Sequence, residues 1–231
     1  MENNNYENTK SVAIIFICHN NETIRECLQK LESSHILFVG DQHIDTDLRE
    51  NPRIIIAREL PDNIESEKKL LTFTAWYAII KNNLFLEYDY LCLFEYDIIL
   101  DQAFGSVIKN LTQDTKYDVI AFIITCGYFL MDINEEVLDE FITAKGVADP
   151  NKYKDGCWYN TTNHCLRRNI LNDFINWYYP DCITIIKAKD IKTLSWYHER
   201  IFYMYMNIKD LFVVRINGIQ HLYKNSHENF Q

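Results

Sequence analysis

Short apolar runs alternate with amphipathic stretches along the first hundred residues. The runs span residues 12–18, 35–39, 53–57 and 90–94. Each run stops at polar residues, which is typical of buried strands that are covered on both faces. Between the runs, residues 22–31 and 62–81 carry apolar side chains at helical spacing, and Asp62 and Glu65 have the spacing of a capping box. This alternation predicts an α/β fold with a mostly parallel sheet flanked by helices.

The second half of the chain continues this alternation with a weaker pattern. We expect helices over residues 103–111, 134–143, 163–178 and 194–207, and strands over residues 117–125, 183–186 and 211–216. Pro180 is expected to end the third of these helices, because proline removes a helical hydrogen bond. Residues 146–159 are polar and predict a loop. We find no repeat and no linker, so residues 1–231 are predicted to form a single domain.

Composition and charge exclude several classes of partner. The net charge of −10 disfavours nucleic acid, which repels an acidic protein. Seven cysteines form no C-x-x-C pair, which indicates buried thiols in a reducing compartment rather than disulfides or a zinc site. The first residues are polar and acidic, and no apolar stretch is long enough to span a bilayer. We therefore expect a soluble, cytoplasmic protein without a transmembrane segment.

Two carboxylates follow the fourth apolar run. Glu95, Tyr96 and Asp97 come directly after residues 90–94. In an open α/β sheet, ligands bind at the carboxyl ends of the strands. Side chains two positions apart on an extended chain point to the same side, so Glu95 and Asp97 could both reach one hard cation. This triplet is the candidate metal site.

Polar residues also end the earlier strands. His19 and Asn20 follow the first run, Asp41 the second and Arg58 the third. These side chains should converge on the same sheet edge and line a pocket for a nucleotide whose phosphates lie near the metal. Asp41 could accept hydrogen bonds from a base or ribose, and Arg58 could pair with a diphosphate. The absence of G-x-G-x-x-G disfavours a dinucleotide cofactor.

This arrangement resembles the metal-dependent glycosyltransferases with the GT-A fold, whose mark is an acid-x-acid triplet after a buried strand. Here the triplet is Glu95-Tyr96-Asp97, with Glu in place of the usual first Asp. The resemblance implies a Rossmann-like domain that binds Mn²⁺ or Mg²⁺ and a nucleotide-sugar donor, with a UDP-sugar favoured. Residues 11–100 would hold the donor, and residues 101–231 would hold the acceptor. The compactness resembles the small glycosyltransferase domains of large DNA viruses, which would place the protein in the host cytoplasm.

The same resemblance implies the reaction and the roles of particular residues. A hexosyl- or deoxyhexosyltransferase would move its sugar to an acceptor hydroxyl, such as that of a glycan. Glu95 and Asp97 would bind the metal, with Tyr96 beside the donor and a late histidine, His221 or else His227, as a further ligand. Glu95 could instead contact the ribose or sugar of the donor.

A base near the acceptor is needed only by an inverting enzyme. Glu199 is the candidate base, and its competing interpretation is a helix residue that is ion-paired with Arg200. Trp158 and Tyr159 are candidates for contact with a sugar acceptor, because aromatic faces pack against sugars. The alternative function is a non-catalytic module that binds a nucleotide sugar or a glycan through a degenerate site.

Overall fold

A computed structural model describes residues 12–40, 42–65, 72–113, 116–122, 126–128, 135–147, 149, 157–159, 162–189 and 194–221. Its centre is a seven-stranded sheet with the strand order β10-β6-β9-β4-β1-β2-β3. In that order the strands are β10 (Val213–Ile216), β6 (Val119–Phe122), β9 (His164–Arg167), β4 (Tyr90–Glu95), β1 (Val12–Cys18), β2 (His35–Phe38) and β3 (Ile54–Ile56).

The sheet is parallel apart from one strand. β1 lies between β2 and β4 and pairs with both in parallel, and β3 continues the same direction beyond β2. β9 runs antiparallel to both of its neighbours, β4 and β6. The carboxyl ends of β1 to β4 therefore meet at one edge. The expected α/β fold with a mostly parallel sheet is confirmed.

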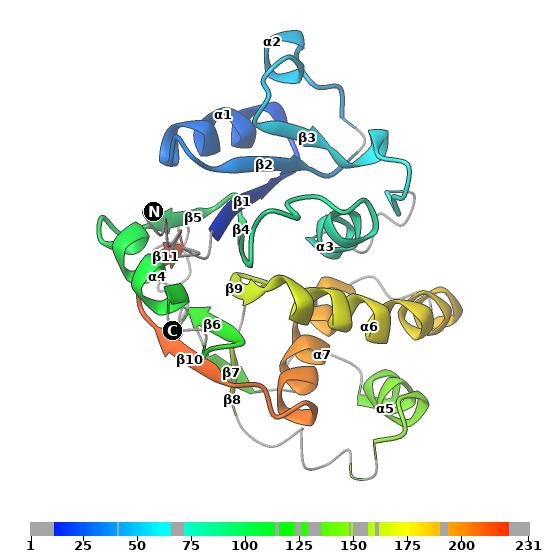
Figure 1. Ribbon diagram of the computed structural model, residues 1–231. Coiled ribbons are helices and arrows are strands. Elements are labelled where there is room, and N and C mark those ends of the chain that lie inside the picture. Colours follow the sequence, from blue (N-terminus) through cyan, green and yellow to red (C-terminus); the bar gives the residue numbers. More distant parts are fainter. Residues whose placement is uncertain are drawn as a thin grey trace, which may run out of the picture.

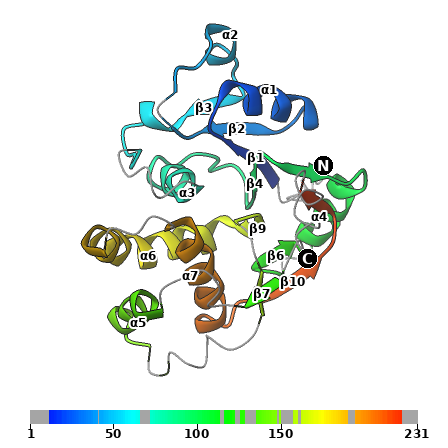
Figure 2. The ribbon, with the colours of Figure 1, turned by 180° about the vertical axis from the view of Figure 1, so that it is seen from behind.

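Helices cover both faces of this sheet (Figures 1 and 2). On one face lie α1 (Asn21–Lys30) and α4 (Phe104–Gln113); on the other lie α3 (Thr72–Lys81), α5 (Glu135–Ala144), α6 (Arg168–Lys189) and α7 (Leu194–Ile208). Alternate residues of β1 feed the two layers, with Ile15 and Ile17 in one core cluster and Phe16 and Cys18 in the other. This is why the strands have apolar residues at every position rather than at every second one.

The helix predicted over residues 62–81 is wrong in its first part. Asp62 to Glu65 are not helical, and the described helix α3 begins at Thr72. The Glu65 carboxylate instead accepts a hydrogen bond from the Gly40 backbone N–H at 2.7 Å. A contact between residues distant in sequence has displaced the local interaction that the capping-box spacing predicted.

The elements around Pro180 also differ from the prediction. Residues 164–167 form β9 instead of a helix, and α6 then continues through Pro180 into residues 183–186, which were predicted to be a strand. The Lys145 ammonium donates to the Trp177 carbonyl and pairs with the Asp181 carboxylate, on the two sides of Pro180. These contacts lie on both sides of the proline, and the helix continues past it although Pro180 has no backbone N–H to donate.

Short elements complete the description: α2 (Thr46–Arg49), a 3₁₀ turn (Ala57–Glu59), and two small antiparallel pairs, β5 (Ile98–Leu100) with β11 (Ile219–His221) and β7 (Cys126–Tyr128) with β8 (Cys157–Tyr159). The loop predicted over 146–159 is therefore wrong at its last three residues. The strand predicted over 117–125 starts two residues later, at Val119, and residues 123–125 lie outside the described part. Among the described residues, no helix combines the length and hydrophobicity needed to cross a membrane.

Candidate functional site

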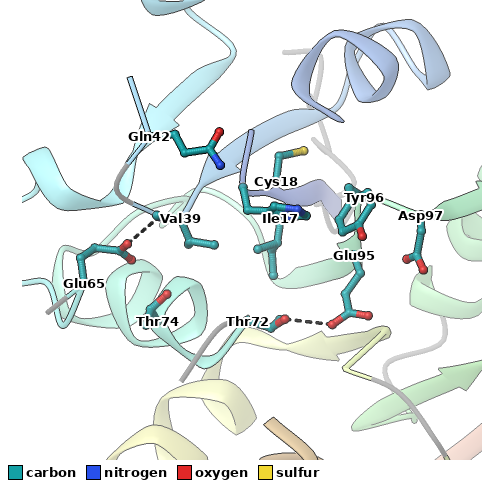
Figure 3. A pocket seen from close by; sticks show the side chains of 12 residues that line it. Ile17, Cys18, Val39, Gln42, Glu65, Thr72, Thr74, Glu95, Tyr96 and Asp97 are labelled. Carbon is teal, nitrogen blue, oxygen red and sulfur yellow. Dashed lines mark hydrogen bonds between the residues drawn. The ribbon is translucent and has the colours of Figure 1, made fainter. Parts of the chain in front are cut away.

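A cavity of about 610 Å³ opens at the carboxyl edge of the sheet (Figure 3). This volume is within the range of small-molecule sites in proteins. Its walls come from the end of β1, the residues after β2, the start of α3 and the end of β4. The lining residues are Ile17, Cys18, His19, Val39, Gly40, Gln42, Glu65, Thr72, Thr74, Glu95, Tyr96 and Asp97.

Glu95 is held at the end of β4 by two polar side chains. Its backbone N–H donates to Asn163 Oδ1 at 2.7 Å, just before β9 begins. Its carboxylate Oε1 accepts from the Thr72 hydroxyl at 2.9 Å, at the first residue of α3. Asn163 and Thr72 are both buried, so these hydrogen bonds are protected from water and fix the direction of the carboxylate.

Asp97 follows in a turn between β4 and β5 and lines the same cavity as Glu95. In Figure 3 the two carboxyl groups hang from the strand end toward the same side. The ring of Tyr96 between them makes an edge contact with the His19 ring, with 4.6 Å between centroids. Two carboxylates on one wall offer the hard oxygen ligands that Mg²⁺ and Mn²⁺ prefer, so the chemistry of this wall fits such a cation.

His221 lies beside this turn through its backbone. In the β5–β11 pair, His221 is opposite Ile98, the residue directly after Asp97. The side chain of His221 is outside the described part, as is the whole of His227, so the assignment of a third ligand stays a prediction. Within the described part of the chain, no group of three His, Cys, Asp or Glu side chains is arranged to hold a metal ion.

The peptide of Gly40 forms the opposite wall and is held on both sides. Its N–H donates to the Glu65 carboxylate, which is only 9% exposed, and its carbonyl accepts from the Arg58 guanidinium at 2.6 Å. Gly40 has φ +136°, a conformation that side-chain-bearing residues rarely adopt. Arg58 itself is exposed and binds the Gly40 carbonyl without being among the residues that line the cavity.

Asn20 and Asp41 were also predicted to contact the nucleotide-sugar donor. The side chain of Asn20 caps α1, because its Oδ1 accepts the Thr23 backbone N–H at 2.8 Å. Contact between Asn20 and a ligand stays a prediction. Asp41 lies outside the described residues.

Glu199 lies on α7 and is nearly buried. Its side chain is 11% exposed, and Arg200 is 3.5 Å away. Burial and then the negative charge of Glu95 raise the pKa of Glu199 to about 8, and Arg200 opposes this shift. Although Glu199 is near enough to sense Glu95, the described lining of the cavity does not include it. The side chains of Trp158 and Tyr159 are outside the described part.

Sequence reasoning missed several residues of this cavity. The spacing of Glu65 predicted a helix cap, and Thr72 and Thr74 carried no local signal. Asn163, which holds Glu95 without lining the cavity, carried none either. Gln42 lies two residues after Gly40, in the turn that closes a buried strand, and this position was the one available sign.

No protein-family model matches the sequence, and a comparison with curated proteins finds no match either. Solved structures are similar in fold. The WbbM bifunctional glycosyltransferase in its apo form superposes with a TM-score of 0.62 at 12% identity, over 92% of this chain and 45% of that chain. Core-mannan synthase A (CmsA/Ktr4) from Aspergillus fumigatus, in its Mn/GDP form, has a TM-score of 0.52 at 11% identity, over 91% of this chain and 74% of that chain.

These similarities show a GT-A-like fold, in agreement with the strand order and with the site at the carboxyl edge of the sheet. The chain spans less than half the length of the first of these structures. The resemblance to viral domains gains no support from the comparisons and stays a prediction.

Proposed function

We propose that this protein is a metal-dependent glycosyltransferase that moves a sugar from a nucleotide-diphosphate donor to an acceptor hydroxyl. One observation carries the proposal: Glu95 and Asp97 line a single cavity at the carboxyl edge of a GT-A-like sheet. Nucleotides bind at this edge in α/β folds, and a carboxylate pair can hold the cation that a diphosphate requires.

The two ends of the cavity suit the two ends of a donor. Glu65 and Gln42 lie at the end away from Asp97 in Figure 3, where their acceptor and donor groups can meet a base or ribose. The acidic end would hold Mn²⁺ or Mg²⁺ through Asp97 and Glu95. When bound there, the cation would stabilise the charge that develops on the leaving diphosphate. A UDP-sugar is the favoured donor, and the Mn/GDP form of the fungal synthase makes a GDP-sugar the first competitor to test.

Glu199 is the proposed base if the reaction inverts the sugar. With its pKa raised to about 8, the ionised Glu199 carboxylate is a stronger base than an ordinary one, and the ionised fraction that can accept a proton grows as the pH rises toward 8. This role requires that an acceptor hydroxyl, such as one on a glycan, reaches the buried side chain of Glu199. Trp158 and Tyr159 are the proposed sugar contacts on the acceptor side, and residues 101–231 are the proposed acceptor half of a single domain.

The test is nucleotide release from a panel of UDP- and GDP-sugars, with and without Mn²⁺. We expect release that depends on Mn²⁺ and falls about 100-fold or more in Asp97→Asn, because the variant loses a ligand of the cation that would stabilise the leaving diphosphate. The matched control is Asp173→Asn, an exposed acid on α6 that should keep full activity. Asp97→Asn should change the free energy of unfolding by less than about 0.5 kcal/mol.

The competing function is a module that binds nucleotide sugars or glycans without turnover. Binding of a nucleotide sugar with no release in any acceptor mixture would favour this module. No nucleotide binding at all would contradict both functions.

A further inference from the structure

The last residue of α1 reaches away from its own helix. The ammonium of Lys30 donates to the backbone carbonyls of Tyr96 and Ile98, the second at 2.7 Å. These two residues stand immediately before and after Asp97 in the chain. One half-buried cation therefore holds the backbone on both sides of the proposed metal ligand.

A second cation leaves Lys30 available for this role. Basic residues in the last turn of a helix usually interact with the carbonyls of that turn. In α1 this task falls to Arg53, whose guanidinium donates to the carbonyl of Leu28 at 3.3 Å and to that of Leu31 at 2.7 Å. Lys30 can therefore extend toward β4 and β5 without leaving the end of its helix unsatisfied.

Neighbouring contacts restrict the motion of Lys30. Its ammonium lies 5.2 Å from the centre of the Phe16 ring, a distance at which a cation is attracted to an aromatic face. Cys27, three residues earlier on the same side of α1, has its sulfur 3.5 Å from the same Tyr96 carbonyl. The helix thus presents two groups, not one flexible side chain, to the turn.

The turn is held from two directions. Thr72 and Asn163 fix Glu95 from the side of α3 and β9, and Lys30 and Cys27 fix the turn from the side of α1. The α1 contacts thus act on the backbone next to Asp97 in addition to the pairing of β5 with β11.

We propose that Lys30 is a positioning residue that fixes the backbone of Asp97, so that the carboxylate is ready to bind a divalent cation. This inference rests on the proposed function, since it assigns Asp97 to a cation. Groups that orient a metal ligand without touching the metal typically change metal affinity about 10- to 100-fold when they are removed.

The experiment measures Mn²⁺ binding by electron paramagnetic resonance and amide hydrogen exchange of the metal-free protein. Lys30→Met should raise the Mn²⁺ dissociation constant about tenfold. It should also speed exchange over residues 90–100 while leaving residues 164–171 unchanged. Lys30→Arg keeps a cationic donor, so it should restore part of the Mn²⁺ affinity and part of the protection from exchange. If Lys30→Met does not fold, Lys30→Gln replaces it as a neutral polar variant.

Lys145 supplies a matched control. It too donates to a helix carbonyl, that of Trp177, and lies 5.0 Å from an aromatic ring centre, but on the α5–α6 side of the molecule. Lys145→Met should bind Mn²⁺ as the parent does. Equal Mn²⁺ affinity in Lys30→Met and the parent would overturn the inference and leave the proposed function standing. A parent protein that binds no Mn²⁺ would overturn both.

Discussion

The carboxyl edge of the sheet and a buried layer around α7 contain titratable side chains in opposite surroundings. The layer consists of Phe73, Trp76, His198, Glu199 and Phe202. At the edge, Glu95 and Asp97 line an open cavity. In the layer, Glu199 is 11% exposed and His198 packs against the rings of Phe73 and Trp76, with centroids 4.9 and 4.8 Å away. The two regions are close enough for the charge of Glu95 to affect the pKa of Glu199.

The two regions differ in their exposure to solvent, although both contain carboxyl groups. A carboxylate on a cavity wall is hydrated and can exchange water for a ligand, whereas a buried carboxyl group is favoured in its neutral form. We therefore expect substitutions at the edge to change binding and turnover, and substitutions in the layer to change stability and its pH dependence. Three changes in the layer test this division, from the largest expected effect to the smallest.

Removing the largest ring of the layer should destabilise the protein most. Trp76 is fully buried and contacts the rings of His198 and Phe202, at 4.8 and 5.2 Å between centroids. Trp76→Ala should lower the free energy of unfolding by about 3–5 kcal/mol, because it leaves a large cavity. Urea denaturation measures this, with Leu86→Ala, at a side chain 63% exposed, as the near-neutral control. A loss below about 1 kcal/mol for Trp76→Ala would contradict tight packing in the layer.

The second change concerns Glu199 at alkaline pH. Because its pKa is raised from 4.5 to about 8, the folded protein keeps a proton that the unfolded chain releases, and stability falls as pH rises across that interval. Glu199→Gln cannot lose this proton. As the pH is raised from 5 to 8, the free energy of unfolding of the variant should therefore increase by about 2–4 kcal/mol relative to that of the parent.

Denaturant unfolding of both proteins at the two pH values measures this gain. Parallel pH profiles would mean that Glu199 is ionised in the folded state and paired with Arg200, as its competing interpretation held. A large loss of turnover with the stability gain would add support for Glu199 as the base.

The third change concerns His198 in acid. Burial and then the nearby His164 lower the pKa of His198 from 6.5 to about 3, so the unfolded chain binds a proton that the folded protein does not. Stability is thus lost as pH falls below about 6.5. When the pH is lowered from 7 to 5, the free energy of unfolding should fall by about 2 kcal/mol less in His198→Phe than in the parent. The exposed His43 provides the control, since His43→Phe should keep the acid sensitivity of the parent.

The amino-acid sequence by itself determined the strands β1 to β4 and the acidic triplet that follows them. Residues 12–18 form β1 as predicted, and the run at 90–94 ends where Glu95 and Asp97 enter the cavity. These features could be predicted because an apolar run of that length, bounded by polar residues, has few ways to be buried other than as a central strand.

Only the tertiary structure decided the remaining features, because each depends on a partner that is distant in the chain. Residues 164–167 form the strand β9 because they pair with β4 on one side and β6 on the other. α6 passes Pro180 with contacts from Lys145 on both sides of the proline. Glu65 lines the cavity because Gly40 offers it an N–H, and Lys30 turns to the Asp97 loop because Arg53 occupies the end of α1. Local periodicity contains no information about such partners. The sequence therefore indicated the acidic triplet at a strand end, and only the fold brought its supporting residues together.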